Sequence, residues 1–341
     1  MIVILMFVSR LRSNFEYELT GPPSGVAKLY TIGDHLVAIS KTNEFYLWDW
    51  NNLEAKPQKG SIRAKKLLCL DDKRILQIPS GSPGTAIVSN LAGDEVYKSL
   101  SLGYNKQCSY MEISGNGRFV VFAMTARAAA ANSGALHQLE LQLLDTDSYE
   151  LSYVTKIDLD DATIEVGNVA VSNDGRFIAL VGHKNDAGWV ALADVSQKQL
   201  LWQRVIEQPV ELAEIVFSPN GKVVYTGGKG RDVYALETTD GNILRKLEMD
   251  KHELPNKKQH VCCIDVTANG SIVAAGTSPA NLVYIWDAKT GNRISIISNV
   301  CPKVLAGPTI LNGLAFSPNS AFFATSDMMA SKKIRVWRIP K

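Results

Sequence analysis

The 341-residue sequence predicts an all-β fold, a seven-bladed β-propeller of four-stranded antiparallel blades. Three observations predict it. A short polar turn recurs between apolar strands, an acid or its substitute follows the third strand of each unit, and no long segment has the 3.6-residue apolar period of a helix. Four-stranded units repeated around an axis form a propeller, which leaves only short sheet edges exposed.

The recurring turn begins with Ser or Thr and in most copies ends in Asn-Gly or Asp-Gly, pairs that supply the positive φ angles of a tight hairpin. Successive copies start 58, 46, 49 and 50 residues apart, at Ser114, Ser172, Ser218, Thr267 and Ser317. One such unit could not bury both faces of its sheet, so we expect the units to stack on one another.

The fifth unit displays its four strands most clearly, at 212–217, 223–226, 232–236 and 243–247. Third strands end near residues 49, 90, 145, 194, 237, 287 and 338, which counts seven blades. The predicted blades cover approximately 25–61, 62–101, 106–156, 164–206, 210–248, 259–298 and 309–339, within a single domain of residues 1–341. The chain stops at Lys341 without a fourth strand for the last blade. We therefore expect residues 14–20, where Phe15 to Leu19 alternate correctly, to supply it.

Trp48-Asp49 and Trp286-Asp287, together with the Ser-Pro-Asn-Gly turn at 218–221, resemble the WD-repeat family, and the resemblance covers roughly residues 25–339. The Gly-His dipeptide that opens many such repeats is absent from the expected positions, and only His260 stands where the family histidine would be. The resemblance implies that loops between strands two and three share one face with the loops between blades. It also implies that the family's buried histidine–aspartate network is mostly missing here.

The loops expected on that face carry the insertions, at Thr125–Ala135, Gly182–Gly188, Glu248–Gln259, Ser298–Pro308 and Asp327–Ser331. Because long loops on a rigid scaffold concentrate binding residues, this face is the predicted partner surface. The resulting hypothesis is a non-catalytic protein-interaction scaffold, a subunit of a larger assembly. The candidate partner-binding residues are Arg127, His183, Lys229, Arg231, His252, Lys257, Lys258, Met328 and Met329.

Two of these groups keep alternative interpretations. The basic loop around Lys257 and Lys258 could meet an acidic peptide or phosphate, or it could be only solvated. Met328-Met329 could be an exposed anchor or could fill a gap in the core. Asp145, Asp194 and Asp287 look like an acidic set, but their regular placement predicts that they cap turns.

Composition narrows the function classes. The formal net charge of +2 lacks the basic excess typical of nucleic-acid binders, so no direct nucleic-acid partner is expected. Five cysteines without a CxxC pair favour reduced thiols in the cytoplasm or nucleus, with no metal site and no cofactor. The apolar run Ile2 to Val8 is too short to span a bilayer, which takes about 20 residues. It is either a strand at the propeller seam or a targeting segment.

No enzyme motif is found in the sequence. The stretch His252 to Asn256 begins like a zinc-protease helix, but it lacks the second histidine and Pro255 would break the helix. The alternative hypothesis is a bacterial-type propeller enzyme or a quinone- or metal-binding propeller, because residues 233–241 resemble a quinoprotein repeat.

Overall fold

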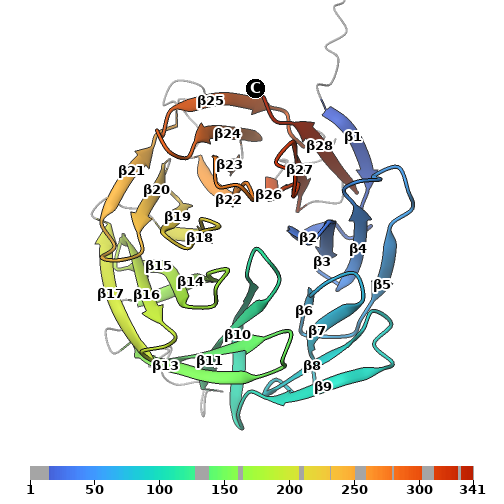
Figure 1. The fold of residues 1–341 in the computed structure, drawn as a ribbon, viewed down its shortest axis with the longest axis vertical. Helices are drawn as coiled ribbons and strands as arrows, with labels where there is room; N and C mark the ends of the chain where they lie inside the picture. The colour runs from blue at the N-terminus through green and yellow to red at the C-terminus, as the bar shows by residue number, and fades with distance from the viewer. Residues whose placement is uncertain are drawn as a thin grey trace, which may run out of the picture.

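Seven four-stranded antiparallel sheets form a ring around a central axis in the computed structural model (Figure 1). The structure describes residues 15–126, 138–159, 164–206, 211–230, 232–249, 259–278, 280–301, 311–328 and 332–340. The predicted seven-bladed β-propeller is therefore confirmed. Within these residues, no helix has the length and apolar character needed to cross a lipid bilayer.

The blades follow one another along the chain, and each runs from an inner strand at the axis to an outer strand at the rim. Blade 1 holds β2 (Val26–Ile32), β3 (His35–Ser40), β4 (Glu44–Asp49) and β5 (Gln58–Ser61). Blade 2 holds β6 (Lys66–Cys69), β7 (Arg74–Ile78), β8 (Thr85–Asn90) and β9 (Val96–Ser101). Blade 3 holds β10 (Lys106–Ile113), β11 (Phe119–Ala126), β12 (Gln138–Asp145) and β13 (Leu151–Asp158). Blade 4 holds β14 (Ile164–Val171), β15 (Phe177–Lys184), β16 (Ala187–Asp194) and β17 (Gln199–Ile206).

The second half of the ring repeats the pattern. Blade 5 holds β18 (Leu212–Phe217), β19 (Val223–Gly228), β20 (Val233–Glu237) and β21 (Ile243–Leu247). Blade 6 holds β22 (His260–Val266), β23 (Ile272–Ser278), β24 (Leu282–Asp287) and β25 (Arg293–Ser298). Blade 7 holds β26 (Leu311–Phe316), β27 (Phe322–Asp327), β28 (Lys333–Arg338) and, from the start of the chain, β1 (Phe15–Thr20).

The core consists of seven hydrophobic clusters, one between each pair of neighbouring blades. Successive residues of a strand point to opposite faces of its sheet, so a strand with neighbours on both sides must be apolar throughout. In β11, Val120 and Phe122 pack toward blade 2, whereas Val121 and Ala123 pack toward blade 4. Each blade therefore depends on both of its neighbours for burial.

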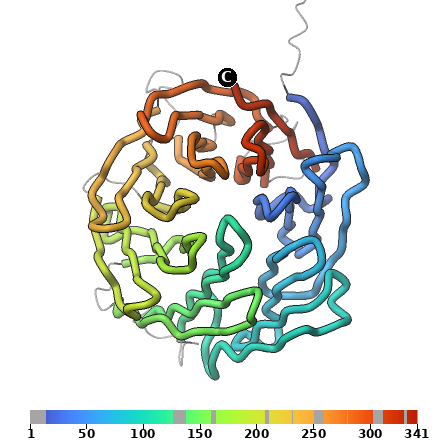
Figure 2. The backbone as a smooth tube through the Cα atoms, viewed as in Figure 1, coloured from blue at the N-terminus to red at the C-terminus, as the bar shows by residue number. Residues whose placement is uncertain are grey.

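The ring is closed by the first described strand. β1 pairs antiparallel with β28, so strands from opposite ends of the described chain lie side by side (Figure 2). The Phe15 ring meets the edge of Trp337 with ring centroids 5.9 Å apart, and Leu19 is buried between blades 7 and 1. Glu18 pairs with Lys333 at 3.1 Å and Arg335 at 3.3 Å. The predicted closure by the N-terminal segment is confirmed.

The five predicted polar turns share one hydrogen-bonding pattern. The Ser172 hydroxyl accepts a bond from the Phe177 N–H at 2.9 Å and donates to Asp174 Oδ1 at 2.6 Å. The same two bonds recur at the turns that begin with Ser114, Ser218, Thr267 and Ser317. Each turn thus ties a hydroxyl to the backbone of the next strand, which fixes where the first hairpin of the blade ends.

The acids after the third strands cap turns, as predicted. Asp145 Oδ1 accepts bonds from the N–H groups of the next turn at 2.9 and 3.1 Å, and Asp194 and Asp287 do the same in blades 4 and 6. These bonds lower the pKa of Asp145, even though partial burial acts in the opposite direction. The regular acid positions are therefore structural.

One predicted loop is wrong. Gly182–Gly188 was expected to be an insertion, but β15 continues to Lys184 and β16 begins at Ala187, with Lys184 opposite Ala187. The connection is a tight turn that Asn185 enters with φ of 53°. Asn tolerates this left-handed conformation, so the strands of blade 4 extend and the polar segment forms a hairpin tip.

The last turn differs from the others in one residue, and this difference is testable. Ser320 has φ of 56°, where the turns in blades 3 to 6 have Gly, with Gly221 at 67°. A side chain in this conformation costs about 1 kcal/mol. We expect Ser320→Gly to raise the free energy of unfolding by up to about 1 kcal/mol and Gly221→Ser to lower it by a similar amount. Urea denaturation of both variants checks this, and equal signs for the two changes would contradict it.

Candidate functional site

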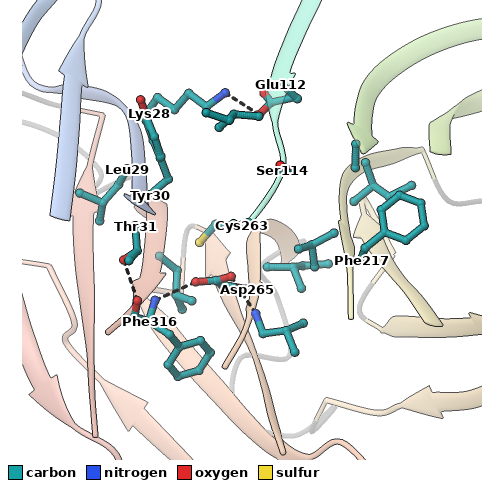
Figure 3. Close-up of a pocket in the computed structure, with 18 of the residues that line it drawn as sticks. Lys28, Leu29, Tyr30, Thr31, Glu112, Ser114, Phe217, Cys263, Asp265 and Phe316 are labelled. Atoms are coloured by element: carbon teal, nitrogen blue, oxygen red, sulfur yellow. Dashed lines mark hydrogen bonds and ion pairs between the residues drawn. The ribbon is translucent and has the colours of Figure 1, made fainter. Parts of the chain in front are cut away.

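A cavity of about 640 Å³ occupies the centre of the ring. Its walls are the inner strands β2, β10, β14, β18, β22 and β26, together with the turns that follow them. Figure 3 displays Lys28, Tyr30 and Thr31 from one side facing Glu112, Phe217 and Asp265 from the others. Six blades thus contribute their innermost side chains to one central channel.

Blade 2 is the exception, because none of its residues lines the cavity. Side chains from blades 1 and 3 form the channel wall in front of its short inner strand β6. The Tyr30 hydroxyl donates to the Cys69 carbonyl at 3.0 Å and accepts from the Cys69 N–H at 2.7 Å. Above it, the Lys28 ammonium reaches Glu112 at 2.5 Å, so an ion pair joins blades 1 and 3 across blade 2 (Figure 3).

Two further carboxylates face the channel. Asp265 Oδ2 accepts from the Phe316 N–H of the next blade at 2.7 Å, and its Oδ1 accepts from the Val266 N–H at 2.8 Å. Burial nonetheless raises the pKa of Asp265 to about 7, since it outweighs these two bonds. Within the described part of the chain, the Glu214 carboxylate makes no hydrogen bond or ion pair. Burial, with Glu112 nearby, raises the pKa of Glu214 to about 8.

The channel residues were not among the predicted site residues. Glu112, Glu214 and Asp265 are each the only acid in their inner strand. Glu165 is likewise the only acid of inner strand β14, yet it lies beside His183 outside the channel, so this pattern alone does not predict which acids face the axis. Across the described residues, no group of three or more His, Cys, Asp or Glu side chains is placed to hold a metal ion.

The described strand ends from which the connections between strands two and three and between blades leave lie on one side of the ring, which we call the connection face. The turns within each blade's two hairpins lie on the opposite side, the hairpin face. His183 ends on the connection face with its Nε2 3.6 Å from Glu165 Oε2. Lys229, just after β19, forms an ion pair with Glu211. Met328, just after β27, is half-buried.

These three predicted residues come from blades 4, 5 and 7, and no hydrogen bond or ion pair among the described residues joins them to one another. The other predicted partner-binding residues lie outside the described residues; they are Arg127, Arg231, His252, Lys257, Lys258 and Met329. Within the described residues, the basic residues that the sequence singled out on this face are paired with acids of their own blade.

Tyr104 is a connection-face residue that the sequence analysis missed. It lies at the tip of the turn between blades 2 and 3, and 91% of its surface is exposed. Its neighbours Gly103 and Asn105 both have positive φ, at 115° and 58°, as residues of tight turns often do. The signal in the sequence was an aromatic residue in a short loop between two predicted strands.

Comparison with known proteins supports the predicted family. The family model "WD domain, G-beta repeat" matches residues 299–338, which include most of blade 7. The chain is also similar to two proteins named periodic tryptophan protein 2 homolog. It is 26% identical over 176 residues to that of Dictyostelium discoideum and 22% identical over 213 residues to that of Mus musculus.

The aligned segments cover 51% and 49% of this chain but only 17% and 22% of those two proteins. The chain therefore spans about a fifth of the length of the curated relatives it matches. The match to the repeat model, the two relatives and the seven-bladed ring together confirm the predicted resemblance to WD-repeat propellers; the subfamily is not identified.

The channel carboxylates predict how stability depends on pH. Raised pKa values mean that the folded state holds these protons more tightly than the unfolded state. Their contribution to stability is therefore fully present below about pH 4 and is lost as the pH rises through 7 to 8. We expect Glu214→Gln to be more stable than the parent at pH 9, by roughly 2 kcal/mol after allowance for channel water, and to differ little at pH 5.

Thermal unfolding of both proteins between pH 5 and pH 9 measures this difference. Glu248→Gln is the matched control, because it removes a carboxylate from an exposed position on the outer side of blade 5. A Glu214→Gln variant that follows the same pH curve as the parent would mean that the carboxylate is well solvated in the channel.

Proposed function

We propose that this WD-repeat-type propeller is a non-catalytic scaffold that binds other proteins through its connection face, as a subunit of a larger assembly. The observation that carries the proposal is the exposed Tyr104, which stands on the same face as His183, Lys229 and Met328. Tyrosine supplies a large contact area at low entropic cost and is enriched among the residues that dominate binding energy. Residues from four places around a rigid ring can then contact one broad partner surface.

The ring itself favours a scaffold. The described strands that flank the connections hold Tyr104, His183, Lys229 and Met328 at fixed places around the ring, and a preorganised set of contacts lowers the entropic cost of binding. The ion pair of Lys229 with Glu211 places opposite charges side by side on this face. Such a mixed pattern orients a partner and selects against wrong ones more than it adds affinity.

The cysteines bear on the compartment in which the chain works. The cysteines of the chain are free thiols, four of them buried, and burial raises the pKa of Cys69 and Cys108 to about 12. Thiols of this kind are unreactive packing residues, which suits a reducing compartment. We therefore assign the chain to the cytoplasm or nucleus, with protein or peptide partners and no direct nucleic-acid contact.

The test compares two multiple variants of the tagged chain. The first carries Tyr104→Ala, Lys229→Glu and Met328→Ala on the connection face. The second carries Lys73→Glu and Lys198→Glu, two exposed positions in hairpin turns of blades 2 and 4. We expect the first to weaken partner binding by tenfold or more, since loss of an anchor residue costs about 2 kcal/mol, and the second to leave it unchanged.

Affinity purification with quantitative mass spectrometry identifies the partners, and titration of a purified partner gives the dissociation constants. Matching melting temperatures of all three proteins are the control for folding. Loss of partners from the hairpin-face variant alone would refute the assignment of the face. Turnover of a substrate by the pure chain would refute the non-catalytic role.

A further inference from the structure

A second hollow lies on the hairpin face, between blades 5 and 6. This groove of about 530 Å³ is formed by the Ser218–Gly221 turn, Tyr225 and Arg245 of blade 5 and by residues 268–270, Ala288 and Lys289 of blade 6. It is separate from the connection face and opens on the opposite side of the ring.

The sheet of blade 5 positions Arg245. Tyr225 in β19 is opposite Ala235 in β20, which is opposite Arg245 in β21, so the three side chains share one face of the sheet. That face packs against blade 6, where Tyr225 and Ala235 belong to the cluster between the two blades. The Arg245 side chain therefore extends into the space between the blades rather than outward from the rim.

Blade 6 leaves room for the arginine stem through one glycine. Gly291, in the turn between β24 and β25, has φ of 77°. A Cβ atom at this position would lie 3.1 Å from Arg245 Cδ and 3.3 Å from Leu247 Cδ2. The turn thus lies directly on the aliphatic part of Arg245 and holds the guanidinium at the groove.

The charged side chains that line the groove are both basic, and the nearby Asp287 carboxylate, in the same turn as Lys289, lies outside the lining. Arg245 and Lys289 are the charged residues in its lining, and no acid lines it. Among the described residues, neither side chain has a hydrogen bond or ion pair, whereas Arg118, Arg176 and Arg338 each pair with an acid. A half-buried guanidinium has lost part of its hydration, so it gains more than an exposed one from an anion brought to it.

We propose that this groove binds an acidic segment of a partner protein, with one carboxylate received by Arg245 and a neighbouring carboxylate by Lys289. Tyr225 also lines the groove, although it is buried. One guanidinium fork matches one carboxylate in bidentate geometry. The site is independent of the connection face, so it gives the scaffold a second partner surface.

The test follows the Arg245 side chain directly. The full chain is labelled with ¹⁵N-arginine and titrated with a short capped peptide of alternating Gly and Glu; parallel titrations use the same peptide with Gln or with phosphoserine in place of Glu. We expect the Glu peptide to shift the Arg245 Nε–H signal in a saturable way and the Gln peptide to leave it unmoved. Arg245→Gln, followed through the backbone amides of the groove, should weaken binding by about tenfold, and Arg245→Lys by less.

Lys98→Gln is the matched control. Lys98 is the third residue of the outer strand of blade 2, as Arg245 is of blade 5, and the substitution changes the net charge of the chain equally. It should bind the Glu peptide as the parent does. The connection-face variant of Tyr104, Lys229 and Met328 should also bind normally, which separates this proposal from the proposed function.

Three results would overturn the proposal. Equal binding of the Glu and Gln peptides would remove the role of charge. Equal weakening by Arg245→Gln and Lys98→Gln would indicate attraction to the net charge alone. Tighter binding of the phosphoserine peptide would replace the acidic segment by a phosphorylated one.

Discussion

The structure depends on the pairing of β1 with β28. Every blade buries its two flanks against its neighbours, so an incomplete blade 7 would expose apolar surface on both sides of the seam. The start of the chain supplies the missing strand and adds Leu19 to the cluster between blades 7 and 1. Because no blade can bury both flanks alone, this contact couples all seven into one cooperative unit.

Closure also explains the channel. Seven sheets packed side by side around an axis leave the inner edge of each sheet next to the central cavity, where no further strand covers that edge. Polar side chains are tolerated there, and Asp265 is satisfied by its bonds to Phe316 and Val266. Where β6 contributes nothing to the wall, Lys28, Glu112 and Tyr30 complete it from blades 1 and 3. The ring therefore closes although blade 2 contributes no residue to the channel wall.

Much of the fold could be predicted from the sequence, because it is encoded locally. The Ser-x-Asn-Gly turns are stabilised by hydrogen bonds between residues close in sequence. The alternation of apolar and polar residues from Phe15 to Leu19 indicates a β-strand, whichever strand it pairs with. The segment Gly182–Gly188 could not be assigned by the same means, since a polar stretch between two strands fits a loop and a hairpin tip equally well. Only its pairing, Lys184 opposite Ala187, decides between them.

The candidate surfaces were harder to predict for a different reason. Lys229 was found from its place in the chain, but its partner Glu211 lies just before inner strand β18, and their pairing depends on the geometry of blade 5. Arg245 carries no signal in the sequence, where it is one of several basic residues in outer strands. Its environment arises between two blades, from Tyr225 on one side and Gly291 on the other.

The two proposed binding surfaces lie on opposite sides of the ring. The groove is between blades 5 and 6 on the hairpin face, so a partner bound there leaves the connection face accessible. In the proposed scaffold, two partners are therefore held at a fixed distance and orientation by the ring between them, without any change in its shape.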